Sequence, residues 1–138
     1  MMVNEGKLQI SLALIRISTA AFFLVWSIEK IIYPEVTQRI LKKFYFLSIS
    51  SSMSVGIGII QTLITLIFLV GLFKTFSYGA LLGMHLVSVL STYKQLFNPY
   101  APGNHLFWSA VPVLAAIIAL FILRNEDRLL TLISCPDN

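Results

Sequence analysis

The sequence predicts an all-α integral membrane protein: a four-helix bundle with a short amphipathic segment in the membrane interface between its first and second helices. Composition is the first reason, since 57% of the 138 residues are hydrophobic and 12% are charged. The mean hydropathy of +0.85 is far above that of a soluble domain, whose surface must be wetted. Segmentation is the second reason, because four apolar stretches approach the ~20 residues that a membrane-spanning helix needs. These are 8–28, 53–73, 76–97 and 106–123, which together predict one transmembrane domain over 1–138.

The last three spans are joined by short connections, which predict that consecutive helices are neighbours. The second and third are separated only by "KTFS" around Lys74, so these two helices are predicted to be antiparallel neighbours. The third and fourth are joined by "NPYAPGNH", in which Gly103 and Asn104 supply turn and N-cap chemistry. Pro112 lies inside the fourth span, where it removes a backbone donor and frees the carbonyl of Trp108, so a kink is predicted there.

The segment between the first and second spans reads "YPEVTQRILKKFYFLSISSS". Charged residues alternate with apolar ones, which predicts a short amphipathic helix lying in the membrane interface. An irregular solvated loop is the alternative, because the segment is short and its apolar face is imperfect. Pro34 marks the position where the first helix ends or bends.

Charge and cysteine content exclude several classes of function. The formal net charge is +4, but the basic residues are scattered and form no continuous face for nucleic acid. Cys135 is the single cysteine of the sequence, so neither an internal disulfide nor dithiol chemistry is expected. No Glu and His cluster offers the ligands of a metal site. We therefore expect no metal and no covalently bound cofactor.

Polar residues inside the apolar spans form stripes at helical spacing, which predicts that they face the interior of the bundle. A guanidinium in hydrocarbon costs at least about 2.5 to 3.5 kcal/mol on insertion scales, so Arg16 needs a partner. Glu126 and Asp127 lie on the same side of the membrane and are within reach if Arg16 extends toward that interface. The alternative is a polar pocket in which Arg16 meets a quinone carbonyl, a lipid headgroup or an anionic substrate. The stripes are Arg16, Thr19, Phe23, Ser27 and Lys30 in the first span, Ser54, Gly58, Gln61 and Thr65 in the second, and His85, Ser88, Thr92 and Gln95 in the third.

His85 admits three interpretations: a haem ligand, a hydrogen bond between helices, or a contact to a quinone or proton relay. A haem bridged within one chain is excluded by depth, because His105 opens the fourth span about 18 Å from the level of His85. The spacing of Gly79 and Gly83 in "GALLG" permits close helix approach, either within the chain or at an interface of a homo-oligomer.

The first span carries a resemblance to a known family. The run "LIRISTAAFFLVWSIEKIIYPE", followed by "FYFLSIS", "GLF" and "LLGMHLVSVLSTYKQLFNPY", resembles the DoxX family of small four-helix membrane proteins over nearly the whole chain. The family pattern of an arginine, spaced small residues and a lysine before a proline is similar to Arg16, Ala20, Ser27, Lys30 and Pro34. Ala20 and Ser27 stand where glycines are more usual in the family.

The resemblance implies a subunit of a membrane oxidoreductase assembly that docks other membrane or peripheral redox subunits and is not catalytic alone. A quinone is then expected in a polar pocket inside the bundle, formed by Arg16, Trp26, Gln61 and His85. The alternative is a structural or assembly subunit whose polar residues only join helices. Basic residues divide almost equally between the two sides of the membrane and do not orient the chain. The resemblance implies the bacterial inner membrane with cytoplasmic termini.

Overall fold

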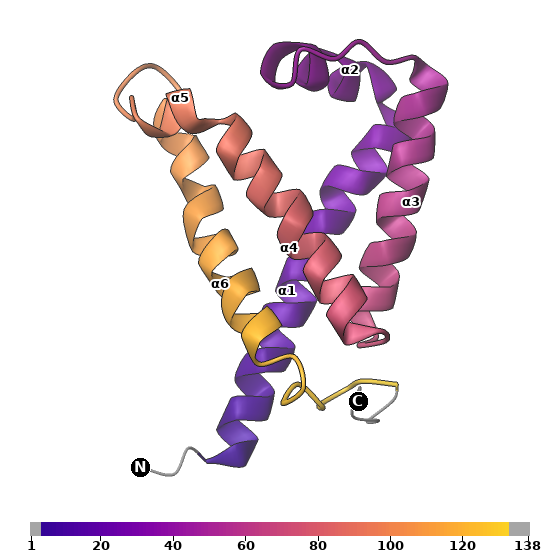
Figure 1. Cartoon of the computed structure of the whole chain (residues 1–138), viewed down its shortest axis with the longest axis vertical. Helices are drawn as coiled ribbons and strands as arrows, with labels where there is room; N and C mark the ends of the chain where they lie inside the picture. The colour runs from indigo at the N-terminus through magenta and orange to yellow at the C-terminus, as the bar shows by residue number, and fades with distance from the viewer. Residues whose placement is uncertain (1–3, 133–138) are drawn as a thin grey trace.

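The computed structural model describes residues 4–132, and this part of the chain is helical without a strand. Cys135 lies outside the described residues. Figure 1 shows long helices that cross one another, with both ends of the chain at the same end of the molecule and α2 at the opposite end. The elements are α1 (Glu5–Ile32), α2 (Pro34–Phe44), α3 (Ser51–Leu69), α4 (Lys74–Ser91), α5 (Tyr93–Leu96), the 3₁₀ helix η1 (Asn104–Ser109) and α6 (Ala110–Ile122).

Three helical stretches within the described residues are long and apolar enough to cross a membrane: Glu5–Ile32, Ser51–Leu69 and Asn104–Ile122. They match three of the four predicted spans. The predicted span 76–97 falls on α4 and α5, two separate helices with Thr92 between them. Lys74, Tyr78 and His85 all lie on α4, and such polar side chains lower the hydropathy of a helix. Membrane insertion and a fourth span therefore stay predictions.

The closest helix pair is α1 with α3. Gly58 explains how their backbones approach, because a Cβ atom at this position would lie 2.8 Å from the carbonyl oxygen of Ser27. The Oγ of Ser54 donates to the carbonyl of Lys30 at 3.0 Å, and the Oγ1 of Thr62 lies 2.9 Å from the Oγ of Ser27. Ser54 and Gly58 of the stripe predicted on the second span thus join α3 to α1, as small and hydroxyl residues do between helices in membranes, whereas Gln61 of the same stripe contacts Met84 of α4.

The hydrophobic core lies where α1, α3, α4 and α6 converge (Figure 1). The rings of Phe68 and Tyr78 lie edge to face, with 4.7 Å between their centroids, and they anchor the short connection between α3 and α4. Beyond this connection α3 and α4 separate toward the α2 end of the molecule (Figure 1). The fully buried apolar residues include Ala20, Phe68, Tyr78, Leu81, Ile117 and Leu120.

The amphipathic segment forms the helix α2, so the irregular-loop alternative is wrong. Pro34 is the first residue of α2 and directly follows Tyr33, which caps the C-terminal end of α1. This position is in keeping with the preference of proline for the first helical turn. Thr37 is buried against the bundle, while the ring of Phe44 lies 6.0 Å from that of Phe107 in η1. The helix α2 therefore bridges the α1–α3 pair and the start of the last helix.

The predicted effect of Pro112 differs from the structure. The chain is 3₁₀-helical from Asn104 to Ser109 and becomes α-helical at Ala110, so Pro112 lies in the first turn of α6. Backbone donors in the first turn have no partner within their own helix, so a proline there interrupts no ladder. The change of helix type precedes Pro112, and the proline does not kink a continuous helix.

Candidate functional site

Arg16 is completely buried, and the structure identifies its partner as Asp127. The Nη1 of Arg16 donates to the Oδ1 of Asp127, and the Nε donates to the carbonyl of Leu69 at 3.1 Å. The Nη2 donates to the carbonyls of Leu129 at 2.6 Å and Leu130 at 3.2 Å. Leu69 ends α3, so the guanidinium also stabilises the negative end of that helix. The prediction that Arg16 reaches an acidic residue after the last helix is confirmed for Asp127.

Asp127 is itself fully buried and is held from three directions. Its Oδ2 accepts a hydrogen bond of 2.8 Å from the Oη of Tyr78, and its backbone carbonyl accepts one from the Nζ of Lys74. Tyr78 and Lys74 both belong to the first two turns of α4. The cluster of Arg16, Lys74, Tyr78 and Asp127 therefore joins α1, α4 and the segment after α6; we call it the charged cluster.

The segment after α6 is fixed by further hydrogen bonds around the charged cluster. The Oε1 of Gln9 accepts from the backbone nitrogens of Arg128 and Leu129, each at 2.9 Å. The backbone nitrogen of Leu132 donates to the carbonyl of Val70 at 2.9 Å, beside the α3–α4 connection. Glu126, the other acidic candidate for Arg16, is instead exposed and lies 3.9 Å from Arg128. Because the polar atoms of Arg16 have partners inside the chain, we assign the charged cluster to holding the fold together.

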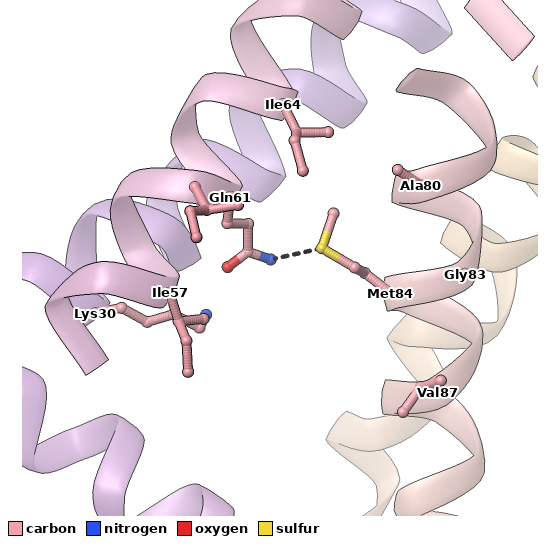
Figure 2. A pocket seen from close by; sticks show the side chains of 9 residues that line it. Lys30, Ile57, Gln61, Ile64, Ala80, Gly83, Met84 and Val87 are labelled. Carbon is pink, nitrogen blue, oxygen red and sulfur yellow. Dashed lines mark hydrogen bonds between the residues drawn. The ribbon is translucent and has the colours of Figure 1, made fainter. Parts of the chain in front are cut away.

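A second feature is a cleft of about 600 Å³ between α3 and α4, which Figure 2 shows from close by. It lies where the two helices separate, and its walls are mostly aliphatic. The polar side chains on its lining are those of Gln61 and Lys30. The lining comprises Ile57, Ile60, Gln61 and Ile64 of α3, Ala80, Gly83, Met84 and Val87 of α4, and Lys30 of α1.

Gln61 is the polar centre of this α3–α4 cleft. Its Nε2 makes a long contact of 3.6 Å to the thioether sulfur of Met84 across the cleft (Figure 2). Its Oε1 is buried and has no hydrogen-bond partner within the described part of the chain. A thioether is a weak acceptor, and an unpaired buried oxygen is costly. The amide therefore retains both an acceptor and a replaceable donor contact for a molecule in the cleft.

Lys30 places a cation at the cleft. Its Nζ donates to the carbonyl of Trp26 at 3.2 Å, one turn earlier on α1. An ammonium has three donors, so further donors of Lys30 are available beside the cleft. Sequence reasoning placed Lys30 on the polar stripe of the first span but did not include it among the site residues. Its position three residues after Ser27, whose helix face packs against α3, was the signal that could have found it.

His85 of α4 and Trp26 of α1 both contact the ring of Phe22 of α1. The ring of Phe22 lies 5.8 Å from that of His85 and 6.4 Å from that of Trp26, measured between centroids. The Nε2 of His85 lies 2.9 Å from the carbonyl of Ala110, which opens α6. A carbonyl only accepts, so this nitrogen carries the proton. The interpretation of His85 as a hydrogen bond between helices is confirmed.

The four predicted site residues are thus not collected in one pocket. Gln61 lines the α3–α4 cleft, His85 and Trp26 pack around Phe22, and Arg16 belongs to the charged cluster. The helix α4 presents Gly83, Met84 and Val87 to the cleft with Gln61, whereas His85 of the same helix bonds to α6. A role in ligand binding stays a prediction for each of the four residues.

The two glycines of "GALLG" lie in different surroundings. A Cβ atom at Gly79 would lie 3.3 Å from the ring of Phe121 of α6, so this glycine permits close packing within the chain. A Cβ atom at Gly83 would meet nothing within 4 Å, because this glycine borders the α3–α4 cleft. An oligomer interface through Gly79 and Gly83 stays a prediction.

Among residues 4–132, no three His, Cys, Asp or Glu side chains gather as a metal site requires. Of the charged cluster and the α3–α4 cleft, the cleft is the one with open volume for a ligand. No family model, curated protein or solved structure matches the chain.

Proposed function

We propose that the chain is a four-span integral membrane subunit of a redox assembly and that its α3–α4 cleft holds a quinone-class molecule. The observation that supports a bound ligand is the state of the Gln61 amide. Its buried Oε1 has no hydrogen-bond partner among the described residues, and its Nε2 has a long contact to the sulfur of Met84. The redox setting, the bacterial inner membrane and the cytoplasmic termini are supported by the resemblance to the DoxX family. They are part of the same proposal.

The chemistry of a quinone suits the polar groups of the cleft. A quinone carbonyl accepts a hydrogen bond, which the Nε2 of Gln61 can donate in place of its weak contact to the Met84 sulfur. The hydroxyl of the reduced form donates, and the Oε1 of Gln61 can accept. The ammonium of Lys30 adds a donor at the same cleft. The aliphatic walls suit an isoprenoid tail, and most ligand pockets likewise combine apolar walls with a few polar groups.

The residues of this pocket differ from those expected from the sequence. Gln61 remains, Lys30 joins it, and Arg16 and His85 have partners elsewhere in the fold. The alternative proposal is a structural or assembly subunit with no ligand of its own. The internal pairing of Arg16 with Asp127 favours that alternative for the charged cluster, but it does not account for the unpaired oxygen of Gln61.

A thermal-shift experiment with a soluble short-chain quinone tests the proposed ligand. We expect the quinone to raise the melting temperature of the wild-type protein in mild detergent, because a ligand at 100 times its Kd stabilises the folded state by about 2.7 kcal/mol. Gln61→Leu should abolish the shift without lowering the melting temperature of the ligand-free protein, since it removes an unpaired buried oxygen.

Two glycines provide a matched control for occupancy of the cleft. Gly83→Leu places a side chain in the cleft and should abolish the shift, whereas Gly56→Leu adds the same atoms to α3 outside the cleft and should retain it. A Cβ atom meets nothing within 4 Å at either position. If wild type shows no shift, or if all four proteins shift equally, the quinone proposal fails and the structural alternative is favoured.

A further inference from the structure

The helix α2 exposes three cations that form no ion pair and no hydrogen bond within the described residues. Arg39, Lys42 and Lys43 are exposed and form neither an ion pair nor a hydrogen bond with residues 4–132, although the Nζ of Lys43 lies 5.3 Å from the centroid of the Phe44 ring. Arg39 and Lys42 are three residues apart and thus share one face of the helix. Unpaired cations on one face attract an anionic partner.

A hollow of about 380 Å³ lies at these side chains, lined by Glu35, Gln38, Arg39 and Lys42. The Nε2 of Gln38 donates to the carbonyl of Ile49 at 2.9 Å, which holds the loop after α2 against the helix. Glu35 lies in the first turn and Lys42 and Lys43 in the last turn. The charge of α2 therefore becomes positive toward the loop.

Phe46 in this loop adds a second observation. It has a left-handed backbone with φ of 55° and a side chain that is 86% exposed. A left-handed conformation is unfavourable for a residue with a Cβ atom, and exposure of the apolar ring to water is unfavourable as well. Aromatic rings at the boundary between acyl chains and headgroups are instead favourable. Other exposed aromatic residues are Tyr33, next to α2, and Tyr93, Phe97, Tyr100 and Trp108, which belong to α5, η1 and the connection between them.

We propose that α2 and the loop after it form a docking surface for anionic phospholipid headgroups. Arg39 and Lys42 contact the lipid phosphate, and Phe46 inserts at the boundary between the headgroups and the acyl chains. The helix is amphipathic, since its other face packs on the bundle through Thr37. Basic amphipathic helices bind anionic membranes through such a combination of charge and apolar insertion. This surface does not depend on what occupies the α3–α4 cleft.

The test measures how tightly the purified full chain holds phosphatidylglycerol compared with phosphatidylcholine, using native mass spectrometry from neutral detergent. Each basic residue near an anionic headgroup contributes about five-fold in affinity. We therefore expect Arg39→Gln combined with Lys42→Gln to weaken phosphatidylglycerol binding roughly 30-fold and to leave phosphatidylcholine binding unchanged. Both side chains are exposed, so the melting temperature in lipid-free detergent should not change.

The matched control is Lys7→Gln combined with Arg128→Gln, which removes the same charge from exposed positions outside α2. It should keep the wild-type preference for phosphatidylglycerol, and that preference should fall with added NaCl. An equal loss in both double variants, or a wild-type preference that is absent or insensitive to salt, would overturn the proposal. If glycerol phosphate alone binds the wild-type protein as tightly as phosphatidylglycerol does, the ligand is a soluble phosphate, and the proposal is also overturned.

Discussion

Arg16→Leu should lower the free energy of unfolding by about 3 to 5 kcal/mol, because removing one partner of a buried ion pair leaves the other charge uncompensated. The stranded group is Asp127, which is fully buried; it keeps the hydrogen bond from the Tyr78 hydroxyl but loses the guanidinium. The carbonyls of Leu69, Leu129 and Leu130 lose their donor as well. The measurement is reversible denaturant unfolding in detergent micelles.

A double-mutant cycle separates this pairing from lost packing. Arg16→Leu combined with Asp127→Leu removes both charges, and we expect it to be more stable than either single variant, because apolar replacement of a whole buried pair is often close to neutral. Arg128→Leu is the matched control, since its pair with Glu126 is exposed and 3.9 Å long; it should change stability by less than about 1 kcal/mol. Additive losses in the double variant would show that the two charges do not depend on each other.

Gly58→Ala should destabilise the protein by about 1 to 3 kcal/mol, because overpacking forces backbone or side-chain shifts of that cost. The added methyl group would lie 2.8 Å from the carbonyl oxygen of Ser27 and from the Cγ1 of Ile31. The first contact is with backbone, so relief requires α1 and α3 to move apart. Such movement would weaken the hydrogen bond from Ser54 to the carbonyl of Lys30.

Gly56→Ala is the matched control on the same helix, because a Cβ atom there meets nothing within 4 Å. This change should be neutral or stabilise by up to about 1 kcal/mol, since alanine favours a helix more than glycine does. Thermal unfolding of the two variants in one detergent makes the comparison. A Gly58→Ala variant as stable as Gly56→Ala would mean that the α1–α3 pair is looser than the structure has it.

The helices were predictable because apolar runs and prolines act locally. Pro34 marks a helix boundary within two residues, whereas the predicted connection at Lys74 is wrong, because residues 74–77 are the first turn of α4 and the chain turns at 70–73. Small or hydroxyl residues at helical spacing predict the face of α3 that meets α1. Asp127 was predictable as a partner of Arg16 because the predicted spans place both residues on the same side of the membrane, and the structure pairs them. These inferences need only periodicity, length and charge.

The site was harder to predict, because periodicity assigns residues to one face of a helix but does not show which other helix that face contacts. His85 and Met84 are adjacent in sequence, yet one bonds to α6 and the other lines the α3–α4 cleft. Tyr78 is not part of the polar stripe predicted for the third span, yet its hydroxyl donates to Asp127, 49 residues later in the chain. The separation of α3 and α4 that opens the cleft depends on how both helices cross α1, which no local pattern encodes.

The 111 residues between Arg16 and Asp127 also have a consequence for biosynthesis. A ribosome that adds about 5 to 20 residues per second needs roughly 6 to 20 s to translate that interval. During this time the first helix carries a guanidinium whose acidic partner has not yet been made. In the membrane setting proposed above, Arg16 would have to stay near the lipid headgroups or at the translocon until the segment after α6 is made. A chain that terminates before residue 127 lacks the acidic partner of Arg16, so this guanidinium would mark an unfinished chain.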